Sequence, residues 1–251
     1  MDNTIKFDGY ANDYTAGRPG YSKGLIDCFF DRFNMSSTSA IADIGSGTGK
    51  FAVHLLDRGC TVYGVEPNDD MRRVAEDELG SFKAFYSVYG GAEDTTLEDK
   101  SVDFITTAQA FHWFDVVKFR QECSRILKPE GKVFLIWNVR DEEDPVNREL
   151  RSIYTKYCPN FNGFNGGISK DDPRIREFFF DKYEHVAFDY PLQLNKEKFI
   201  ARSLSGSYSI KEGDKDYEEY MDRVLEVFDK YSGDGKVTIG NRSEAYIGCV
   251  N

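Results

Sequence analysis

The sequence has few of the side chains from which metal and disulfide sites are built. Its 251 residues include five cysteines and three histidines, and no two cysteines form a C-x-x-C pair. Zinc sites and disulfide frameworks need cysteines that are spaced more closely and regularly than these. We therefore expect no metal site, and we expect every cysteine to be buried and reduced. The cysteines are Cys28, Cys60, Cys123, Cys158 and Cys249.

Long apolar runs and runs of basic residues are missing as well. No apolar stretch approaches the roughly 20 residues that span a bilayer, and the first residues have no apolar core of signal-peptide length. Lys and Arg total 32 against 43 Asp and Glu, and the resulting formal net charge of −11 repels phosphate backbones and anionic lipid. We therefore predict a cytoplasmic protein that binds neither nucleic acid nor membrane, and the sequence leaves both a monomer and a homodimer open.

The composition nevertheless supports a large folded core. Hydrophobic residues make up 40% of the chain and aromatic residues 15%, which is enough for one large domain or one domain with an insertion. Between residues 39 and 140, short apolar runs alternate with helical patterns, as in a parallel sheet wound with helices. The strands that we expect span residues 40–44, 61–66, 82–88, 102–107 and 132–138.

Weaker patterns flank this core. Apolar residues at helical spacing predict helices over 20–33 and 217–231 and after Asp115, and Lys128–Gly131 predicts a turn. Two short strands are expected around Gly240-Asn241, and they would complete the sheet. The organisation that we expect is an N-terminal cap segment with a helix at 1–38, a core at 39–140, a substrate lid at 141–232 and C-terminal strands at 233–251. The predicted fold is therefore α/β, with a Rossmann-like, doubly wound, mostly parallel seven-stranded sheet and an inserted helical lid.

The segment after the first expected strand is rich in glycine. It consists of Asp43-Ile44-Gly45-Ser46-Gly47-Thr48-Gly49 and leads into a helical pattern. In a doubly wound sheet such a loop lies at the carboxyl ends of the strands, where backbone N–H groups can approach a nucleotide-like ligand. A dinucleotide fingerprint would need Gly or Ala in place of Lys50, and a Walker loop would need Gly in place of Ile44 and a hydroxyl in place of Phe51. Taken alone, the loop also fits a tight turn between a strand and a helix.

A carboxylate follows the second expected strand. Glu66 ends the run Val62-Tyr63-Gly64-Val65-Glu66 and lies about 20 residues beyond the glycine loop. At this place a carboxylate can accept hydrogen bonds from both hydroxyls of a ribose. The loop and the acid together predict a site for an adenosyl ligand.

Several segments together resemble the class I methyltransferases, and within them the small-molecule type-11 group that includes trans-aconitate methyltransferase-like proteins. The resemblance covers most of the chain. The segments that carry it are Tyr14 with Arg18-Pro19-Gly20-Tyr21, the glycine loop, Val65-Glu66-Pro67-Asn68 with Met71, Gly91-Ala92-Glu93, Ala110-Phe111-His112-Trp113-Phe114 and Arg125-Ile126-Leu127-Lys128-Pro129-Glu130-Gly131. The resemblance implies S-adenosylmethionine as the cofactor and S-adenosylhomocysteine as the product.

The family's cofactor contacts can be carried over to matching positions. In that family the glycine loop faces the methionine part of the cofactor, the acid binds the ribose and an Ala-Glu pair borders the adenine. The N-terminal tyrosine and arginine lie beside the methionine carboxylate, a role that suits the rigid fork of donors of an arginine. The cofactor-binding residues implied are Tyr14, Arg18, Asp43, Gly45, Ser46, Gly47, Glu66, Pro67, Met71, Ala92, Glu93 and Gln109.

The expected acceptor side lies after the fourth strand. His112 and Trp113 stand in an aromatic cluster at the mouth where a methyl group would be presented, and the unperturbed pKa of histidine near neutrality suits a proton acceptor. His112 is therefore the candidate catalytic residue. The candidate substrate-binding residues are Tyr10, Trp113, Ser205 and Tyr208, the last two from a Ser/Gly-rich stretch similar to one that lines the acceptor pocket in relatives.

The function predicted from these residues is transfer of a methyl group from S-adenosylmethionine to a small-molecule acceptor by in-line displacement. Two alternatives remain open at this point. One is a nicotinamide nucleotide oxidoreductase, which shares the sheet, the glycine loop and the acid at the ribose, although Lys50 disfavours it. The other is a domain that binds S-adenosylmethionine or S-adenosylhomocysteine without turnover.

Overall fold

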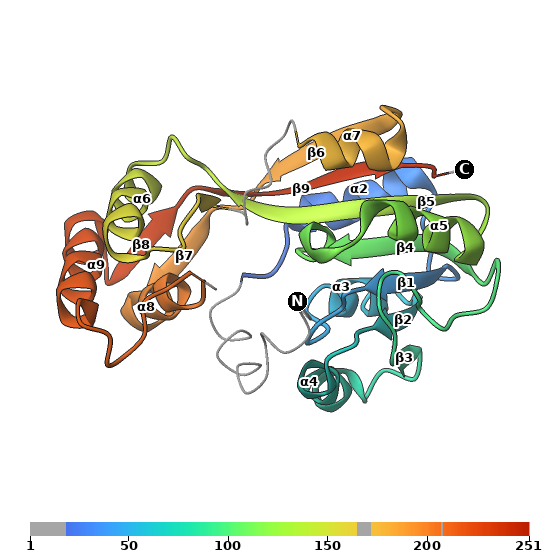
Figure 1. The fold of residues 1–251 in the computed structure, drawn as a ribbon, viewed down its shortest axis with the longest axis horizontal. Coiled ribbons are helices and arrows are strands. Elements are labelled where there is room, and N and C mark those ends of the chain that lie inside the picture. Colours follow the sequence, from blue (N-terminus) through green and yellow to red (C-terminus); the bar gives the residue numbers. More distant parts are fainter. Residues whose placement is uncertain (1–18, 165–171, 207, 251) are drawn as a thin grey trace.

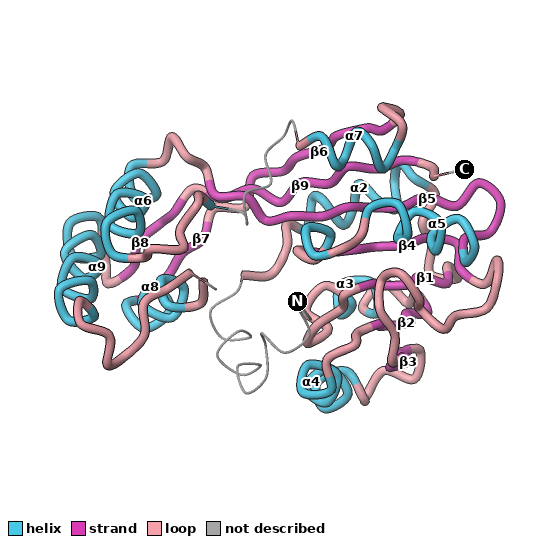
Figure 2. Tube along the Cα trace, in the orientation of Figure 1, coloured by secondary structure: helices cyan, strands magenta, loops and turns pink. Residues whose placement is uncertain are grey.

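The chain forms two lobes that share two long strands (Figure 1). The computed structural model describes residues 19–164, 172–206 and 208–250. Figure 2 shows a larger lobe built on the main sheet and a smaller lobe of helices with a short sheet. The predicted site residues Tyr10, Tyr14 and Arg18 lie outside the described residues.

The main sheet has seven strands in the order β3-β2-β1-β4-β5-β9-β6. The strands are β1 (Ala40–Ile44), β2 (Thr61–Val65), β3 (Phe85–Val88), β4 (Val102–Ala108), β5 (Leu127–Arg140), β6 (Tyr183–Asp189) and β9 (Asn241–Gly248). The first five pair in parallel, and β9 is antiparallel to both β5 and β6. The predicted Rossmann-like, mostly parallel sheet is confirmed.

Helices cover both faces of this sheet. Apolar residues at helical spacing give these helices an apolar face that packs against the sheet. They are α2 (Lys23–Phe33), α3 (Ala52–Leu56), α4 (Asp69–Leu79), α5 (Val116–Ile126) and α7 (Pro173–Phe179). One apolar cluster joins α2 and α3 to the sheet through Phe29 and Leu55, and another joins α5 and α7 to it through Phe119 and Phe178. Side-chain caps mark where helices begin, for example Asp115, whose carboxylate accepts from the N–H groups of Val117 and Lys118 at the start of α5.

The turn predicted at Lys128–Gly131 lies inside a strand. β5 already begins at Leu127, and its pairing with β4 shifts register between Val102 and Phe104, which pair with Leu127 and Lys132. The residues between them form a bulge in which Glu130 has a φ of 67°. β5 therefore runs from the end of α5 to Arg140 and is much longer than expected.

The smaller lobe contains α6 (Pro145–Tyr157), α8 (Lys196–Leu204), α9 (Tyr217–Tyr231) and a two-stranded sheet of β7 (Leu192–Asn195) and β8 (Lys236–Ile239). Its core includes Leu150, Phe199 and Tyr220. Figure 1 shows β5 and β9 reaching from the larger lobe toward this one.

The segment expected to form the lid is divided between the lobes. Within 141–232, α7 and β6 return to the main sheet, and the helices α6, α8 and α9 form the smaller lobe. The expectation that both C-terminal strands complete the main sheet is wrong for β8, which pairs with β7. The reason is that Val237 and Ile239 of β8 are fully buried in the core of the smaller lobe.

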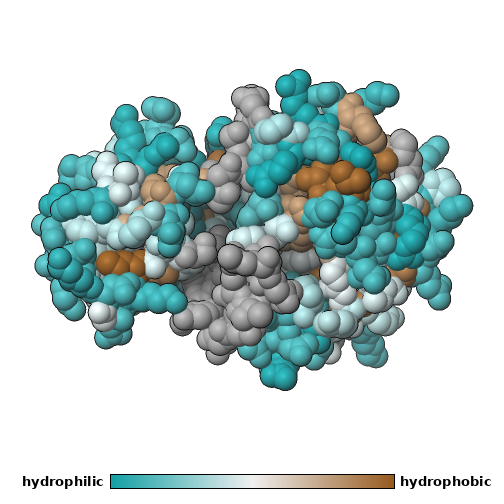
Figure 3. Space-filling model, in the orientation of Figure 1, coloured by the Kyte–Doolittle hydropathy of each residue, from teal (hydrophilic) through white to brown (hydrophobic). Residues whose placement is uncertain are grey.

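The face in Figure 3 is mostly hydrophilic over both lobes, and apolar side chains gather there in limited areas. Across the described ranges, no helix is long and apolar enough to cross a membrane. Four cysteines are buried, but Cys249 is exposed, so its predicted burial is wrong. The reason is its position one residue beyond the end of β9, outside the pairing of the sheet.

Candidate functional site

The glycine loop leaves the carboxyl end of β1 in a conformation that needs glycine. Gly45 has a φ of 68°, and its N–H donates to the carbonyl of Val65 at the end of β2 over 2.9 Å. A Cβ added to Gly45 would lie 2.6 Å from the Cβ of Ala110, which follows β4. The loop is therefore held against the ends of two neighbouring strands, and a side chain at Gly45 would push them apart.

Gly47 stands in different surroundings. Its φ is 55°, and a Cβ added to it would meet no heavy atom of the described residues within 4 Å. Its N–H donates to Oε2 of Glu66 over 3.0 Å. Among the residues that the structure describes, the Cβ position of Gly47 is thus uncovered directly beside the hydrogen bond that joins the loop to the acid.

Glu66 is held in place by the backbone on two sides. Its Oε1 accepts from the N–H of Asn68 over 3.0 Å, while Oε2 accepts from Gly47. Burial raises the pKa of Glu66, and these two backbone hydrogen bonds and the charge of Arg72 oppose the rise. Since each carboxylate oxygen can accept more than one hydrogen bond, Glu66 retains capacity to accept from the hydroxyls of a ligand.

Asp43 is a second carboxylate at the end of β1. It is 1% exposed, and its Oδ1 accepts from the hydroxyl of Thr106 on β4 over 2.7 Å. Its Oδ2 is buried without a hydrogen-bond partner among the residues that the structure describes. Burial raises the pKa of Asp43 to about 7, against the hydrogen bond from Thr106, and the charge of Glu66 adds to the rise. An unsatisfied buried oxygen of this kind is suited to a ligand that donates a hydrogen bond.

The proposed adenine side is built from the start of α4 and from the loop after β3. Asn68 caps α4 by accepting from the N–H of Met71, whose side chain is buried. Pro67 is half-buried beside them. Ala92 packs in the apolar cluster that includes Ile44 and Val65, at the ends of β1 and β2.

Glu93 follows Ala92 and is exposed, but its side chain is engaged. Its Oε1 accepts from the backbone N–H of Asp115 over 2.8 Å. This bond joins the loop after β3 to the start of α5. Glu93 therefore helps to position the loop after β3.

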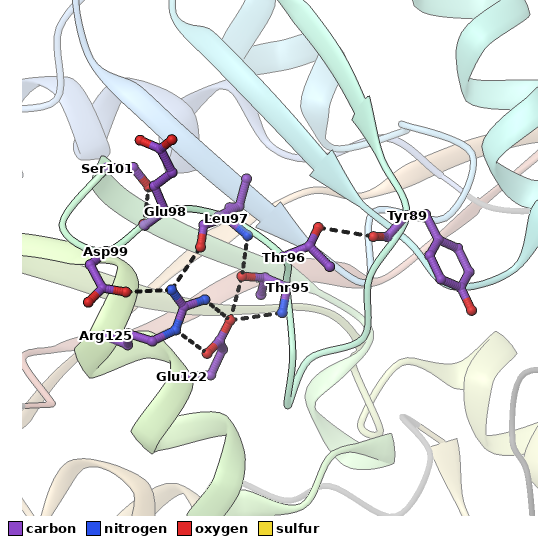
Figure 4. A network of polar contacts seen from close by, with 9 residues as sticks. All are labelled: Tyr89, Thr95, Thr96, Leu97, Glu98, Asp99, Ser101, Glu122 and Arg125. Atoms are coloured by element: carbon purple, nitrogen blue, oxygen red, sulfur yellow. Dashed lines mark hydrogen bonds and ion pairs between the residues drawn. The ribbon is translucent and has the colours of Figure 1, made fainter.

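A buried carboxylate fixes the next part of the same loop, as Figure 4 shows. Oε1 of Glu122 on α5 accepts from the N–H of Thr95 over 2.8 Å and from its hydroxyl over 2.5 Å. Arg125 donates to both oxygens of Glu122, to the carbonyl of Leu97 and to Asp99. These bonds hold the loop that carries Ala92 against a rigid helix, and they lower the pKa of Glu122 although burial alone would raise it.

The residues after β4 face the glycine loop. Gln109 has a φ of 59°, which is uncommon for a residue other than glycine, and its Nε2 donates to the carbonyl of Asn138 on β5 over 3.1 Å. A short 3-10 helix, η2 (Phe111–Trp113), follows, and the rings of His112 and Trp113 lie with their centroids 4.8 Å apart. Strained backbone at such a place is often retained for function.

The structure brings one group of predicted residues together and leaves another apart. Asp43, Gly45, Ser46, Gly47, Glu66 and Gln109 all lie at the carboxyl ends of β1, β2 and β4, and Ala110 links them to η2. Ser205 and Tyr208 lie in the smaller lobe. Ser205 donates to the carbonyl of Arg202 at the end of α8, and the ring of Tyr208 packs on Phe161.

Several residues of this region carry no signal in the sequence. Thr106 orients Asp43, and Arg72 donates to the carbonyls of Glu66 and Pro67, so it fixes the turn after β2. Glu122 looks like a surface residue of an amphipathic helix. A spacing of three between Glu122 and Arg125 could have suggested an ion pair, but not its contact with the distant loop.

The described ranges contain no group of three His, Cys, Asp or Glu side chains that could hold a metal ion. The arrangement instead offers two carboxylates, backbone N–H groups and a glycine whose Cβ position no described atom approaches within 4 Å, all at the end of a parallel sheet. Such an edge is where nucleotide-like ligands bind in doubly wound folds.

Comparison with known proteins agrees with this geometry. The family model for a methyltransferase domain matches residues 42–135. An uncharacterized methyltransferase of Mycobacterium tuberculosis is 30% identical over 226 residues, covering 90% of this chain and 86% of the relative. An uncharacterized methyltransferase-like protein of Schizosaccharomyces pombe is 32% identical over 217 residues, covering 81% and 79%.

Solved structures share the fold. A candidate type II methyltransferase of Anaeromyxobacter dehalogenans superposes with a TM-score of 0.63 at 18% identity and covers 93% of this chain and 98% of its own. A phosphoethanolamine N-methyltransferase of Haemonchus contortus, solved with phosphomonomethylethanolamine and S-adenosylhomocysteine, has a TM-score of 0.55 at 17% identity and covers 98% and 59%. By its relatives and its fold, the chain belongs to the class I methyltransferases, the family of enzymes that use S-adenosylmethionine.

Proposed function

We propose that this methyltransferase transfers the methyl group of S-adenosylmethionine to a small-molecule acceptor, with the cofactor lying across the carboxyl ends of β1, β2 and β4. The observation that carries the proposal is the hydrogen bond from Gly47 to Glu66, beside a Cβ position at Gly47 that no atom of the described residues approaches within 4 Å. This bond supports the ribose-binding role proposed for Glu66, because it holds the carboxylate against the loop expected to face the methionine part. Family membership favours methyl transfer over the nicotinamide oxidoreductase considered above.

The residues present fit such a cofactor. Glu66 would accept from the ribose hydroxyls with its remaining lone pairs, and Oδ2 of Asp43 would accept from a donor of the methionine end. Gly45, Ser46 and Gly47 would leave room for that end. Pro67, Met71 and Ala92 would form an apolar slot for the adenine, with Glu93 at its rim and Gln109 near the methyl group.

When bound, the cofactor supplies an electrophilic methyl group on a sulfonium. In the transfer, a bond would form from an acceptor atom to the methyl carbon while the bond from that carbon to sulfur would break, and sulfur would keep the electron pair. The protein contributes alignment and exclusion of water rather than a covalent intermediate. Trp113 beside His112 would help to cover the acceptor. Tyr14 and Arg18 stay proposed cofactor contacts and Tyr10 a proposed substrate contact.

His112 is the proposed proton acceptor. If the acceptor atom carries a proton, as a hydroxyl, an amine or a carbon acid does, that proton would pass to the imidazole as the new bond forms. A carboxylate acceptor would need no base. Ser205 and Tyr208 stay proposed substrate contacts from the smaller lobe.

The substitution His112→Ala tests this role. We expect it to reduce turnover about a hundredfold or more, the scale of general-base catalysis, and to change affinity for S-adenosylhomocysteine little. His185→Ala is the matched control, since His185 lies on β6, where it stacks on Tyr246. Acceptor-screen activity and calorimetric affinity are measured for both variants. Small and equal changes in turnover and in affinity for S-adenosylhomocysteine would show that His112 is not a catalytic residue.

A further inference from the structure

One residue of β5 holds two segments that border the proposed site. Asn138 lies near the end of β5 and is half-buried. Its backbone carbonyl accepts from Nε2 of Gln109 over 3.1 Å, and its side-chain amide donates to the carbonyl of Gly20 over 2.8 Å. Asn138 therefore joins the chain that leaves β4 to the chain that leads into α2.

The parallel pairing of β4 and β5 brings Asn138 beside Gln109. Ala108, the last residue of β4, pairs with Ile136, and the N–H of Gln109 donates to the carbonyl of Ile136 over 2.9 Å. Carbonyls two residues apart in a strand point toward the same neighbouring strand, so the carbonyl of Asn138 also faces the chain that leaves β4. Gln109, with its left-handed φ of 59°, is thus held by β5 at both its N–H and its side chain.

The antiparallel pairing on the other side of β5 supplies a partner for the Asn138 side chain. Asn138 and Ser243 are directly opposed in the β5–β9 ladder, and such residues project from the same face. The hydroxyl of Ser243 donates to Oδ1 of Asn138 over 2.6 Å, and its Oγ accepts from the N–H of Ser22 over 2.9 Å. Ser243 is fully buried, so water does not compete for these hydrogen bonds.

These contacts allow only one orientation of the Asn138 amide. A backbone carbonyl accepts hydrogen bonds and cannot donate them, so the amide nitrogen must face Gly20 and Oδ1 must face Ser243. Asn138 and Ser243 together hold the backbone before α2 at two points, the carbonyl of Gly20 and the N–H of Ser22.

The same short segment also contacts the side of the sheet where the glycine loop lies. The ring of Tyr21 lies edge-on to the ring of Phe51, which follows the loop, with centroids 4.9 Å apart. A Cβ added to Gly20 would lie 3.7 Å from Nε2 of His54 on α3. Residues 20–22 therefore contact both the helix after the glycine loop and the end of β5.

Both segments held by Asn138 border the methionine end of the proposed cofactor site. The glycine loop is expected to face that end, and Gln109 is proposed to lie near the methyl group. The ribose and the adenine are proposed to bind farther along the sheet, at Glu66 and Met71. A displacement of Asn138 would therefore disturb one end of the ligand and leave the adenosine contacts in place.

We propose that Asn138 is a positioning residue for the methionine end of the cofactor, and that it acts by holding Gln109 and the backbone of residues 20–22. The proposal rests on the proposed function, because it concerns the ligand of that site. Groups that contact a ligand need to be held within about 0.5 Å of their productive positions. The hydrogen bonds of Asn138 provide such support from outside the ligand's own contacts.

Two ligands that differ only at the methionine end test the proposal. They are S-adenosylhomocysteine and methylthioadenosine, which keeps the adenosine and the sulfur but has a methyl group in place of the amino-acid portion. Calorimetric titration, direct or by competition, gives the ratio of the two affinities. We expect Asn138→Ala to lower this ratio about tenfold, the scale of one hydrogen bond to a charged group. Affinity for methylthioadenosine should stay close to that of the wild-type protein.

Ser243→Ala tests the same support from β9 without a change at Asn138. It removes the donor to Oδ1 of Asn138 and the acceptor for the N–H of Ser22. The bond from Asn138 to Gly20 remains possible, so we expect the affinity ratio to fall in the same direction but by less. This variant keeps the test decisive if Asn138→Ala does not fold.

Asn147→Ala is the matched control. Asn147 is fully buried, and its Nδ2 donates to the carbonyls of Asp141 and Gly240, each over 2.8 Å, but it lies on α6 in the smaller lobe. We expect Asn147→Ala to lose at least as much thermal stability as Asn138→Ala and to keep the wild-type affinity ratio. Thermal unfolding of every variant measures the stability.

The outcomes separate positioning from a general structural role. An unchanged ratio in the folded Asn138→Ala or Ser243→Ala protein would overturn the proposal, and so would an equal loss of affinity for both ligands. A similar fall of the ratio in Asn147→Ala would overturn it as well. If the wild-type protein does not bind S-adenosylhomocysteine at all, it is the proposed function that fails.

Discussion

Gly47→Ala separates the backbone role of the glycine loop from its role in binding. At a φ of 55° a left-handed conformation costs an L-residue about 1–2 kcal/mol, but the added methyl group meets no atom of the described residues within 4 Å. The loss of stability should therefore be limited to that backbone cost, which corresponds to a fall in Tm of about 2–8 °C for a chain of this size. If the cofactor fills the space beside Gly47, the methyl group meets it directly. We expect affinity for S-adenosylhomocysteine to fall about tenfold to a hundredfold, or about 1.4–2.8 kcal/mol.

Gly235→Ala is the matched control. Gly235 has a φ of 73°, and a Cβ there also meets no described atom within 4 Å, but it lies beside β8 in the smaller lobe. It should lose similar stability and keep its affinity. Calorimetric titration and thermal unfolding of both variants give the two quantities. A folded Gly47→Ala protein that binds S-adenosylhomocysteine like the wild type would show that the cofactor does not lie beside Gly47. An equal loss of affinity in Gly235→Ala would show the same.

Two other properties follow from the carboxylates. Since burial raises the pKa of Asp43 to about 7, its stabilising contribution is complete below the ordinary carboxyl pKa and is lost as pH rises through 7. Because the ionised form of Asp43 accepts hydrogen bonds best, affinity for S-adenosylhomocysteine should fall about tenfold from pH 8 to pH 6. Asp43→Asn should remove most of this pH dependence in calorimetric titrations. A pH dependence that persists in Asp43→Asn would have to come from another group. Glu122→Gln should destabilise the fold by about 1.5–3 kcal/mol, since it weakens buried hydrogen bonds to a charged group. The control Glu76→Gln, at an exposed position, should leave the stability unchanged. Denaturant unfolding measures both variants, and equal stabilities would contradict the structural role of the hydrogen bonds around Glu122.

The sequence was sufficient to predict the core of the larger lobe because local patterns determine it. Five apolar runs became β1 to β5, and the glycine loop and Glu66 lie at adjacent strand ends as their order along the chain requires. Parallel strands joined by helices leave little freedom in how such residues meet.

The other assignments depend on contacts between distant segments. β8 pairs with β7 rather than with the main sheet, and β6 joins the main sheet from within the expected lid. The local sequence of a short strand does not identify its pairing partner, because the partner is determined by which side chains are buried in the tertiary structure. The burial of Arg140 could not be predicted from the sequence either, since a charged residue at the end of a strand usually faces solvent.

A crystal structure of the complex with S-adenosylhomocysteine is the decisive measurement. We expect both ribose hydroxyls to donate to the carboxylate of Glu66 and the homocysteine end to lie beside Gly45 and Gly47. A ribose bound elsewhere, with Glu66 held only by Gly47 and Asn68, or a nicotinamide dinucleotide bound in preference, would contradict it.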